Sequence, residues 1–160
     1  MGIDERAIEA HHEAGHAVAC YIFGVPIIEA WISPDGTGGV RHQLASVRKG
    51  TARWRVHCRR RAMISLAGPA AQELFTYDGR PADRRWWSDH ENAKKWMDEI
   101  DETSDWRSVA PALIEETFLM LMERPTWRAI GEVADLLVNR GRLPGAFVEQ
   151  LCRRFKVEQK

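Results

Sequence analysis

The chain has 160 residues, of which 44% are apolar and 29% are charged, a profile typical of a folded globular protein and not of a disordered one. Its 23 basic and 23 acidic residues leave no net charge, which argues against a general role in binding nucleic acid or anionic membranes. The length suits one domain, and we predict a single domain over residues 1–160.

The chain also lacks the signals that direct a protein out of the cytoplasm. No apolar run approaches the roughly 18 residues of a membrane span, and the charged N-terminal residues contain no apolar signal core. The cysteines Cys20, Cys58 and Cys152 are far apart, odd in number and form no CxxC pair, so we expect reduced thiols. These features together predict a cytoplasmic protein without membrane insertion.

The first predicted element is a helix over residues 4–23. Asp4 is a favourable N-cap and Gly24 a favourable C-terminal stop. Residues at helical spacing share one face, and several of them are small, so a second helix can approach closely. These residues are Ile8, His12, Gly15, Ala19 and Ile22.

Residues 25–43 predict a small β-hairpin or a short sheet with an exposed edge. Pro26 and Pro34 exclude a helix here, and the isoleucines and tryptophan of residues 27–32 favour a strand. The glycine-rich residues 35–39 predict a turn, after which Val40 begins a return strand.

The rest of the chain predicts helices, so the expected fold is mainly α (α+β). A second helix is predicted over residues 51–75, where Pro69 indicates a kink or a break and the small residues of the second half pack on the first helix. A loop over 76–88 follows. The later helices are predicted over residues 88–100, 109–124, 126–139 and 143–155.

Two groups of distinctive residues have an ordinary structural interpretation beside a functional one. The run Arg59, Arg60 and Arg61 is interpreted as a solvated helix face, with a local basic patch as the alternative. Tryptophans near position 89 are interpreted as core, with a hydrophobic substrate pocket as the alternative. They are Trp86, Trp87 and Trp96.

The motif with the clearest chemistry is HEAGH at residues 12–16. On a helix, positions i and i+4 lie on one face, so His12 and His16 can bind one metal ion, most typically Zn²⁺. Glu13 then lies beside the metal and suits a general base. His11 points about 100° away from His12 and is not expected to be a ligand. The alternative is a pair of hydrogen-bonded core histidines.

A catalytic zinc site needs a third protein ligand. The long form of the motif would place a histidine six residues after His16, but that residue is Ile22, so this form is excluded. Imidazole and carboxylate ligands also accept iron, cobalt or nickel. The candidates for the third ligand are Asp89, His90, Glu91, His42 and His57.

Four segments in order resemble the protease domain of FtsH-type ATP-dependent zinc metalloproteases. They are HEAGHAV at residues 12–18, AWISPDG with the following Gly39 and Val40, LAGPAAQEL at residues 66–74, and SDHENA at residues 88–93. The C-terminal Leu136-Leu137 and Leu143-Pro144-Gly145 also fit that family's closing helices, so the resemblance extends over nearly the whole chain.

The resemblance implies a helical zincin-type peptidase domain in which Asp89 is the third zinc ligand. A carboxylate at that position is also favoured by the predicted helix start. The resemblance is incomplete, because no P-loop occurs, Pro69 stands where the family has arginine, and His90 replaces an apolar residue. We therefore expect a stand-alone peptidase without its own ATPase and membrane anchor, whose partner is a separate ATPase or a further copy in a homo-oligomer.

The expected function is zinc-dependent hydrolysis of peptide bonds in unfolded or flexible polypeptides. An extended substrate would pair with the predicted strands, so the substrate-binding residues are expected to be Trp31, Ile32, Gly39 and Val40. The alternatives are a catalytically silent zinc-binding regulatory or adaptor module, a helical protein with an accidental HExxH, and a zincin of the phage-repressor-cleaving kind with a glutamate ligand.

Overall fold

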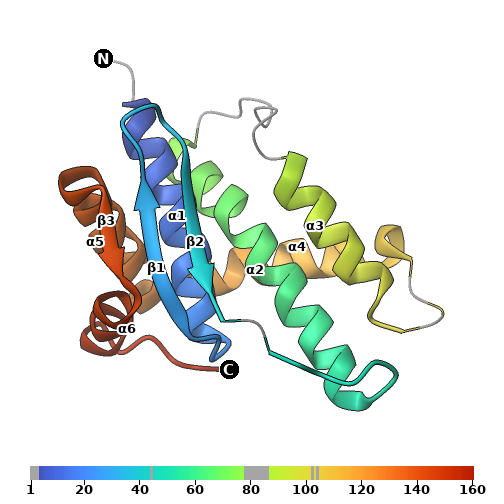
Figure 1. Cartoon of the computed structure of the whole chain (residues 1–160). Helices are drawn as coiled ribbons and strands as arrows, with labels where there is room; N and C mark the ends of the chain where they lie inside the picture. Colours follow the sequence, from blue (N-terminus) through green and yellow to red (C-terminus); the bar gives the residue numbers. More distant parts are fainter. Residues whose placement is uncertain (1–3, 44, 78–86, 102, 104) are drawn as a thin grey trace.

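The computed structural model describes the whole chain except residues 1–3, 44, 78–86, 102 and 104. The mainly α (α+β) prediction is confirmed, because helices dominate the described residues and the strands form a small antiparallel sheet (Figure 1). The elements are α1 (Glu5–Ile22), β1 (Ile27–Ile32), β2 (Gly38–His42), α2 (Ala52–Thr76), α3 (Trp87–Asp98), α4 (Trp106–Met122), α5 (Arg124–Arg140), β3 (Arg142–Pro144) and α6 (Gly145–Arg154).

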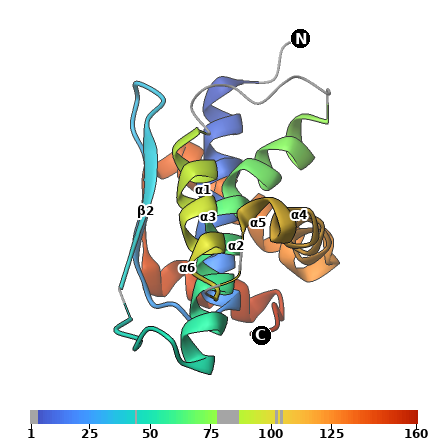
Figure 2. The ribbon, with the colours of Figure 1, turned by 90° about the vertical axis from the view of Figure 1, so that its right-hand side faces the viewer.

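Helix α1 lies at the centre of the molecule. The Asp4 side chain accepts a hydrogen bond from the backbone N–H of Arg6 and caps the helix, as the sequence predicted. From Ala10 onward almost every residue of α1 is buried, because the helix contacts α2 and α5 as well as β1 and β2. Figure 2 shows the sheet along one side of the helices. A central helix of this kind holds its polar side chains in a fixed, largely water-free setting.

Gly15 lets α2 approach α1 closely. A Cβ atom on Gly15 would lie 2.4 Å from the Ala67 carbonyl oxygen and 2.6 Å from the Ala71 Cβ, both far inside van der Waals contact. The small residues predicted to form this face therefore meet the small residues of the second half of α2, as expected from the sequence.

Replacing Gly15 by alanine is expected to destabilise the protein by about 1–3 kcal/mol, the typical effect of overpacking a core. Gly131 in α5 is the matched control, because a Cβ there meets nothing within 4 Å. Gly131→Ala is expected to stabilise the protein by up to about 1 kcal/mol, through helix propensity alone. Urea unfolding of the two variants measures the difference, and equal stabilities would contradict the close approach of the helices.

The sheet has the strand order β2-β1-β3, with both pairs antiparallel. Trp31 of β1 pairs with Gly39 of β2 on one side and with Arg142 of β3 on the other. The predicted strand pair after the first helix is present, and β1 has the predicted bounds of residues 27–32. Because β1 is central, only β2 and β3 lie at the edges of the sheet.

Two predicted helix starts were wrong, and one of the two alternatives at Pro69 is excluded. The last helix begins at Gly145 and not at residue 143, because residues 142–144 join the sheet as β3. Of the kink or break predicted at Pro69, the break is excluded, because helix α2 continues through this residue. Burial of the surrounding residues against α1 outweighs the lost backbone hydrogen bond. Helix α4 begins at Trp106, three residues before the predicted start, where Asp105 caps it.

The other helix predictions agree with the structure to within two residues, and Gly141 caps α5 in the left-handed conformation. Most of the loop predicted over residues 76–88 lies outside the described residues, as does Trp86. In the described part of the chain, each helix is too short or too polar to traverse a lipid bilayer.

Candidate metal centre

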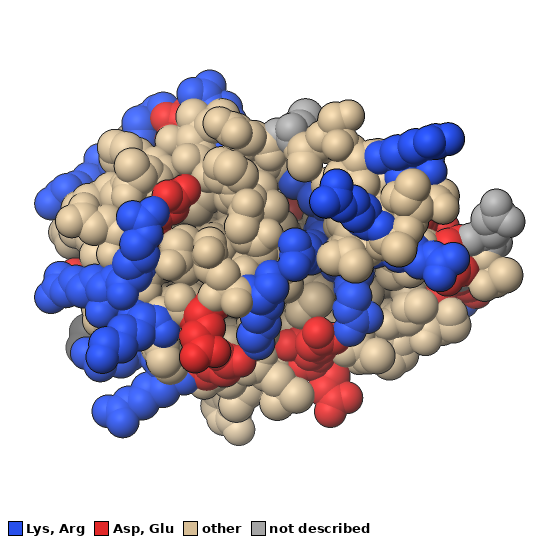
Figure 3. All heavy atoms as spheres, turned by 90° about the horizontal axis from the view of Figure 1, so that it is seen from below, with Lys and Arg blue, Asp and Glu red and all other residues tan. Residues whose placement is uncertain are grey.

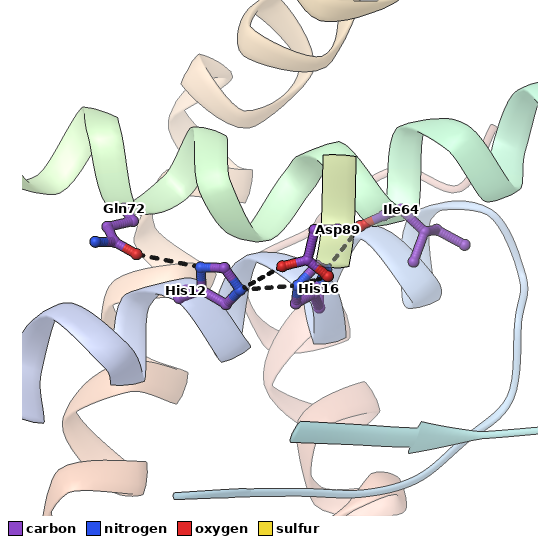
Figure 4. A network of polar contacts seen from close by, with 5 residues as sticks. All are labelled: His12, His16, Ile64, Gln72 and Asp89. Atoms are coloured by element: carbon purple, nitrogen blue, oxygen red, sulfur yellow. Dashed lines mark hydrogen bonds and ion pairs between the residues drawn. The ribbon is translucent and has the colours of Figure 1, made fainter. Parts of the chain in front are cut away.

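The two histidines of the HEAGH motif converge with Asp89 at one point. His12 and His16 come from α1, and Asp89 comes from the first turn of α3, on the opposite side of the point where they meet (Figure 4). The Nε2 atoms of His12 and His16 are 3.1 Å apart, and the Asp89 carboxylate oxygens lie 3.0 Å and 3.6 Å from them. Residues that are 77 positions apart in the chain thus form one compact donor set.

These separations fit zinc coordination. Atoms held about 2.0–2.1 Å from a tetrahedral zinc ion lie about 3.4 Å from one another, and the three observed separations lie on either side of that value. Two imidazoles and one carboxylate also form a typical ligand set for catalytic zinc. Among the residues that the structure describes, His12, His16 and Asp89 are the only group of three such side chains close enough to share an ion.

The Nδ1 atoms of both imidazoles, which face away from the donor set, are hydrogen-bonded to oxygen atoms. His12 Nδ1 lies 3.2 Å from the Gln72 side-chain oxygen, and His16 Nδ1 lies 2.7 Å from the Ile64 carbonyl oxygen (Figure 4). An oxygen of this kind accepts the Nδ1 proton, which leaves the Nε2 lone pair of each neutral ring directed at the other. Two facing lone pairs repel unless a proton or a metal ion lies between them.

Glycine at position 68 makes room for the His16 ring. A Cβ on Gly68 would lie 2.2 Å from His16 Nε2, so any larger residue at position 68 would displace the His16 ring. Gly38 of β2 does the same for Glu13, because a Cβ there would lie 2.7 Å from Glu13 Cγ. The sheet and α2 therefore set the positions of the motif side chains from two sides.

Glu13 lies beside the donor set in a nearly dry position, with 5% of its surface exposed. Burial raises the pKa of Glu13 to about 7, an effect that the charge of His16 opposes. A carboxylate with a pKa near neutrality can accept a proton and release it again at physiological pH. The position and the acidity of Glu13 therefore suit the role of general base.

The protons of His16 and Asp89 are coupled. Burial disfavours the charged form of each group, but the hydrogen bond and charge of Asp89 raise the pKa of His16 to about 9. Hydrogen bonds from His12 and His16 hold the pKa of the Asp89 carboxyl well below its usual range, against the effect of burial. In the metal-free protein at neutral pH, a proton on His16 therefore faces the Asp89 carboxylate.

Zinc binding is expected to strengthen with pH, because the ion must displace the His16 proton. The apparent dissociation constant should fall about tenfold per pH unit between pH 6.5 and about 9 and then level off. Competition with a zinc-binding dye at several pH values measures this slope, and calorimetry in two buffers measures the released proton. Equal affinities at the two ends of this interval would contradict the expectation.

The stability of the metal-free protein should follow the opposite trend. Because the folded pKa of His16 is raised, its contribution is complete below about pH 6.5 and is lost as the pH rises through about 9. The raised pKa of Glu13 adds a destabilising effect that grows between about pH 4.5 and 7. Thermal unfolding with and without zinc separates these trends, since bound zinc should stabilise the protein most at high pH.

The other candidate ligands lie in different surroundings. His42 receives a hydrogen bond from Arg61, and the ring of His57 stacks on Trp54. The Glu91 carboxylate pairs with Lys94 at the surface. His90 belongs to no group of metal-binding side chains within the described residues.

His11 points away from the donor set, as the helix geometry predicted. Its Nδ1 donates to the Ala7 carbonyl oxygen, and its ring stacks on Phe75. All three cysteines are buried as free thiols. Of these, Cys20 lies in the wall of the cleft next to the donor set.

A cleft of about 440 Å³ opens over His12, Glu13, His16 and Asp89. Of the four residues predicted to bind substrate, Gly39 and Val40 line this cleft, whereas Trp31 and Ile32 do not. Ile32 is buried in the core, and Trp31 packs its ring against the Cα of Gly39. Because β1 is the central strand, both edges of its backbone are paired within the sheet, and an extended substrate cannot add to it.

Several residues that support or line this site were not predicted from the sequence. Gln72 and Gly68 lie in the segment LAGPAAQEL, and helical spacing places Gly68 and Gln72 one turn apart on one face. That spacing was a usable signal. Arg61, which lines the cleft, stood in a basic run interpreted as a solvated face.

Compared with protein-family models and with curated protein sequences, the chain shows no match. The geometry of the site and the motifs of the sequence are therefore what supports a function.

Proposed function

We propose that this chain is a zinc metalloendopeptidase that hydrolyses peptide bonds in unfolded or flexible polypeptides. The observation that carries the proposal is the convergence of two imidazole Nε2 atoms and one carboxylate beside a buried glutamate. A zinc-binding module without catalysis needs His12, His16 and Asp89, but it has no need of Glu13. The resemblance of the motifs to FtsH-type metalloproteases supports the same activity.

In this mechanism His12, His16 and Asp89 hold the ion. When bound, zinc supplies Lewis acidity, which acidifies water and polarises the carbonyl group of the substrate. Glu13 accepts a proton from the attacking water and delivers it to the leaving amine. Gln72 and the Ile64 carbonyl hold the imidazoles in the orientation that the reaction needs.

The substrate is proposed to bind along β2. This strand lies at the edge of the sheet, and its residues Gly38, Gly39 and Val40 line the cleft. A free strand edge offers backbone N–H and C=O groups to an extended peptide, which favours unfolded chains over folded proteins. Such chains would be proteins unfolded by a separate ATPase or substrates that are already flexible.

Hydrolysis of casein by the zinc-loaded protein tests the proposal. Cleavage that disappears on chelation and returns with zinc would support it. Binding of one zinc per chain without cleavage of any unfolded substrate would instead favour the regulatory or adaptor module.

A further inference from the structure

A second concavity adjoins the metal cleft. This groove, of about 690 Å³, lies between the end of α1, the segment after β2 and the first half of α2. Its walls include the apolar side chains of Phe23, Val25, Val47 and Val56. Arg61 lines both the groove and the metal cleft, so the two concavities share this side chain as a common wall.

The groove is basic as well as apolar. Arg53, Arg60 and Arg61 line it, and none of its lining residues is acidic. Helical spacing places Arg53 and Arg60 on one face of α2, with Arg61 about 100° further around the helix, on the side of the groove that meets the metal cleft. The face of the molecule seen from below carries many lysine and arginine side chains, with acidic side chains confined to a few patches (Figure 3).

Among the residues that the structure describes, the half-buried Arg61 guanidinium has no carboxylate partner. One of its N–H groups lies 3.1 Å from His42 Nε2, and the guanidinium lies 5.3 Å from the centre of the Trp96 ring. Within the described residues, no carboxylate oxygen lies within 4.0 Å of its nitrogens. Burial lowers the pKa of Arg61, which reflects the free energy that an unpaired cation loses away from water.

Its neighbour Arg59 shows the contrast. Arg59 forms an ion pair with Glu116 at the surface, so its charge is satisfied within the chain. The basic run is therefore divided: Arg59 faces solvent and α4, while Arg61 faces the cleft. Within the described part of the chain, the Arg61 guanidinium is therefore left to interact with the contents of the cleft and groove.

We propose that the groove and Arg61 bind a segment of the polypeptide substrate that mixes apolar with acidic side chains, one carboxylate of which pairs with the Arg61 guanidinium. The inference rests on the proposed peptidase function and specifies its substrate class. Because the groove extends beyond Arg61 and carries two more arginines, the bound substrate segment continues past this residue. The carboxylate is therefore an Asp or Glu side chain and not the C-terminus.

Binding can be measured apart from cleavage. The probe is a labelled peptide that alternates leucine with glutamate, compared with its glutamine isostere, each with a free and an amidated C-terminus. The zinc-loaded Glu13→Gln protein is titrated into each of these four peptides, and fluorescence anisotropy measures binding. The glutamate peptide should bind about tenfold more tightly than the isostere, with no effect of the C-terminus, and the preference should weaken at high salt.

Arg61→Gln should abolish this preference, whereas the matched control Arg59→Gln should retain it. Val56→Glu adds a second variant at an exposed position of the groove wall, where a carboxylate beside the arginines should weaken binding of the glutamate peptide. A preference that survives Arg61→Gln, or that depends on the free C-terminus, would overturn the assignment. An Arg61-dependent preference without cleavage by the wild type would refute the peptidase and keep the anion-binding site.

Discussion

Glu13→Gln is expected to reduce hydrolysis of casein by about 10²–10⁴-fold while leaving zinc content at one ion per chain. Glutamine is nearly isosteric with glutamate, so the fit of the side chain against Gly38 is preserved. It cannot accept a proton from water, however, and the reaction loses its base. Elemental analysis and a hydrolysis assay on the same preparation measure the two quantities together.

Removing the buried acid should also change stability in a defined direction. Folding disfavours the Glu13 carboxylate, since burial raises its pKa to about 7. A neutral amide at this position avoids that effect, so the metal-free variant should be at least as stable as the wild type above pH 7. A loss of activity together with unfolding would therefore not count as evidence for catalysis.

The control is Glu5→Gln, the same substitution at an exposed residue of the same helix. It removes one charge from the first turn of α1 and should cost only a few tenths of a kcal/mol in stability. Its hydrolysis rate should match that of the wild type. Undiminished cleavage by Glu13→Gln would remove Glu13 from the mechanism.

The parts of the fold that the sequence predicted well depend on local interactions. The bounds of α1 follow from an N-cap at Asp4 and a stop at Gly24, and those of β1 follow from a run of strand-forming residues between Pro26 and Pro34. Such signals act within one or two turns of the chain. They need no knowledge of what the element packs against.

The parts that were missed depend on contacts between distant segments. Residues 142–144 become a strand only because they pair with the side of β1 that β2 leaves unpaired, more than a hundred residues earlier in the chain. Likewise, α2 passes through Pro69 because α1 buries the residues on either side of it. Neither effect has a signal in the neighbouring residues.

The candidate metal site shows the same division. His12, Glu13 and His16 were predicted from spacing on one helix, whereas the choice of Asp89 among five candidate third ligands required a resemblance to a family. Gln72 and Arg61 were not predicted, because their roles arise where α2 meets α1 and the sheet. Spacing within one helix is visible in a sequence, and the orientation between helices is not.

Substitution of a ligand should remove the metal with little effect on the fold. His16→Ala and Asp89→Asn are each expected to weaken zinc binding by more than the roughly 10–100-fold loss that follows removal of an outer hydrogen-bond partner. Each variant loses one of the three donors that meet near the His12 Nε2 atom. Zinc per chain after gel filtration should therefore fall from about one to nearly zero.

The two variants should differ in the metal-free state. Asp89→Asn removes the carboxylate that raises the pKa of His16, so stability around pH 7–8 should no longer benefit from a protonated His16. In His16→Ala, the Asp89 carboxylate keeps only one histidine partner, His12, to lower its pKa. Circular dichroism of both variants, taken before zinc is added, establishes whether they are folded.

Glu91→Gln is the matched control for the third ligand. Glu91 lies two residues after Asp89 on α3, but its carboxylate pairs with Lys94 at the surface. The structure therefore predicts full zinc content in this variant and loss in Asp89→Asn. The reverse result would move the third ligand to Glu91 and would require α3 to rotate on metal binding, because both side chains cannot face α1 at once.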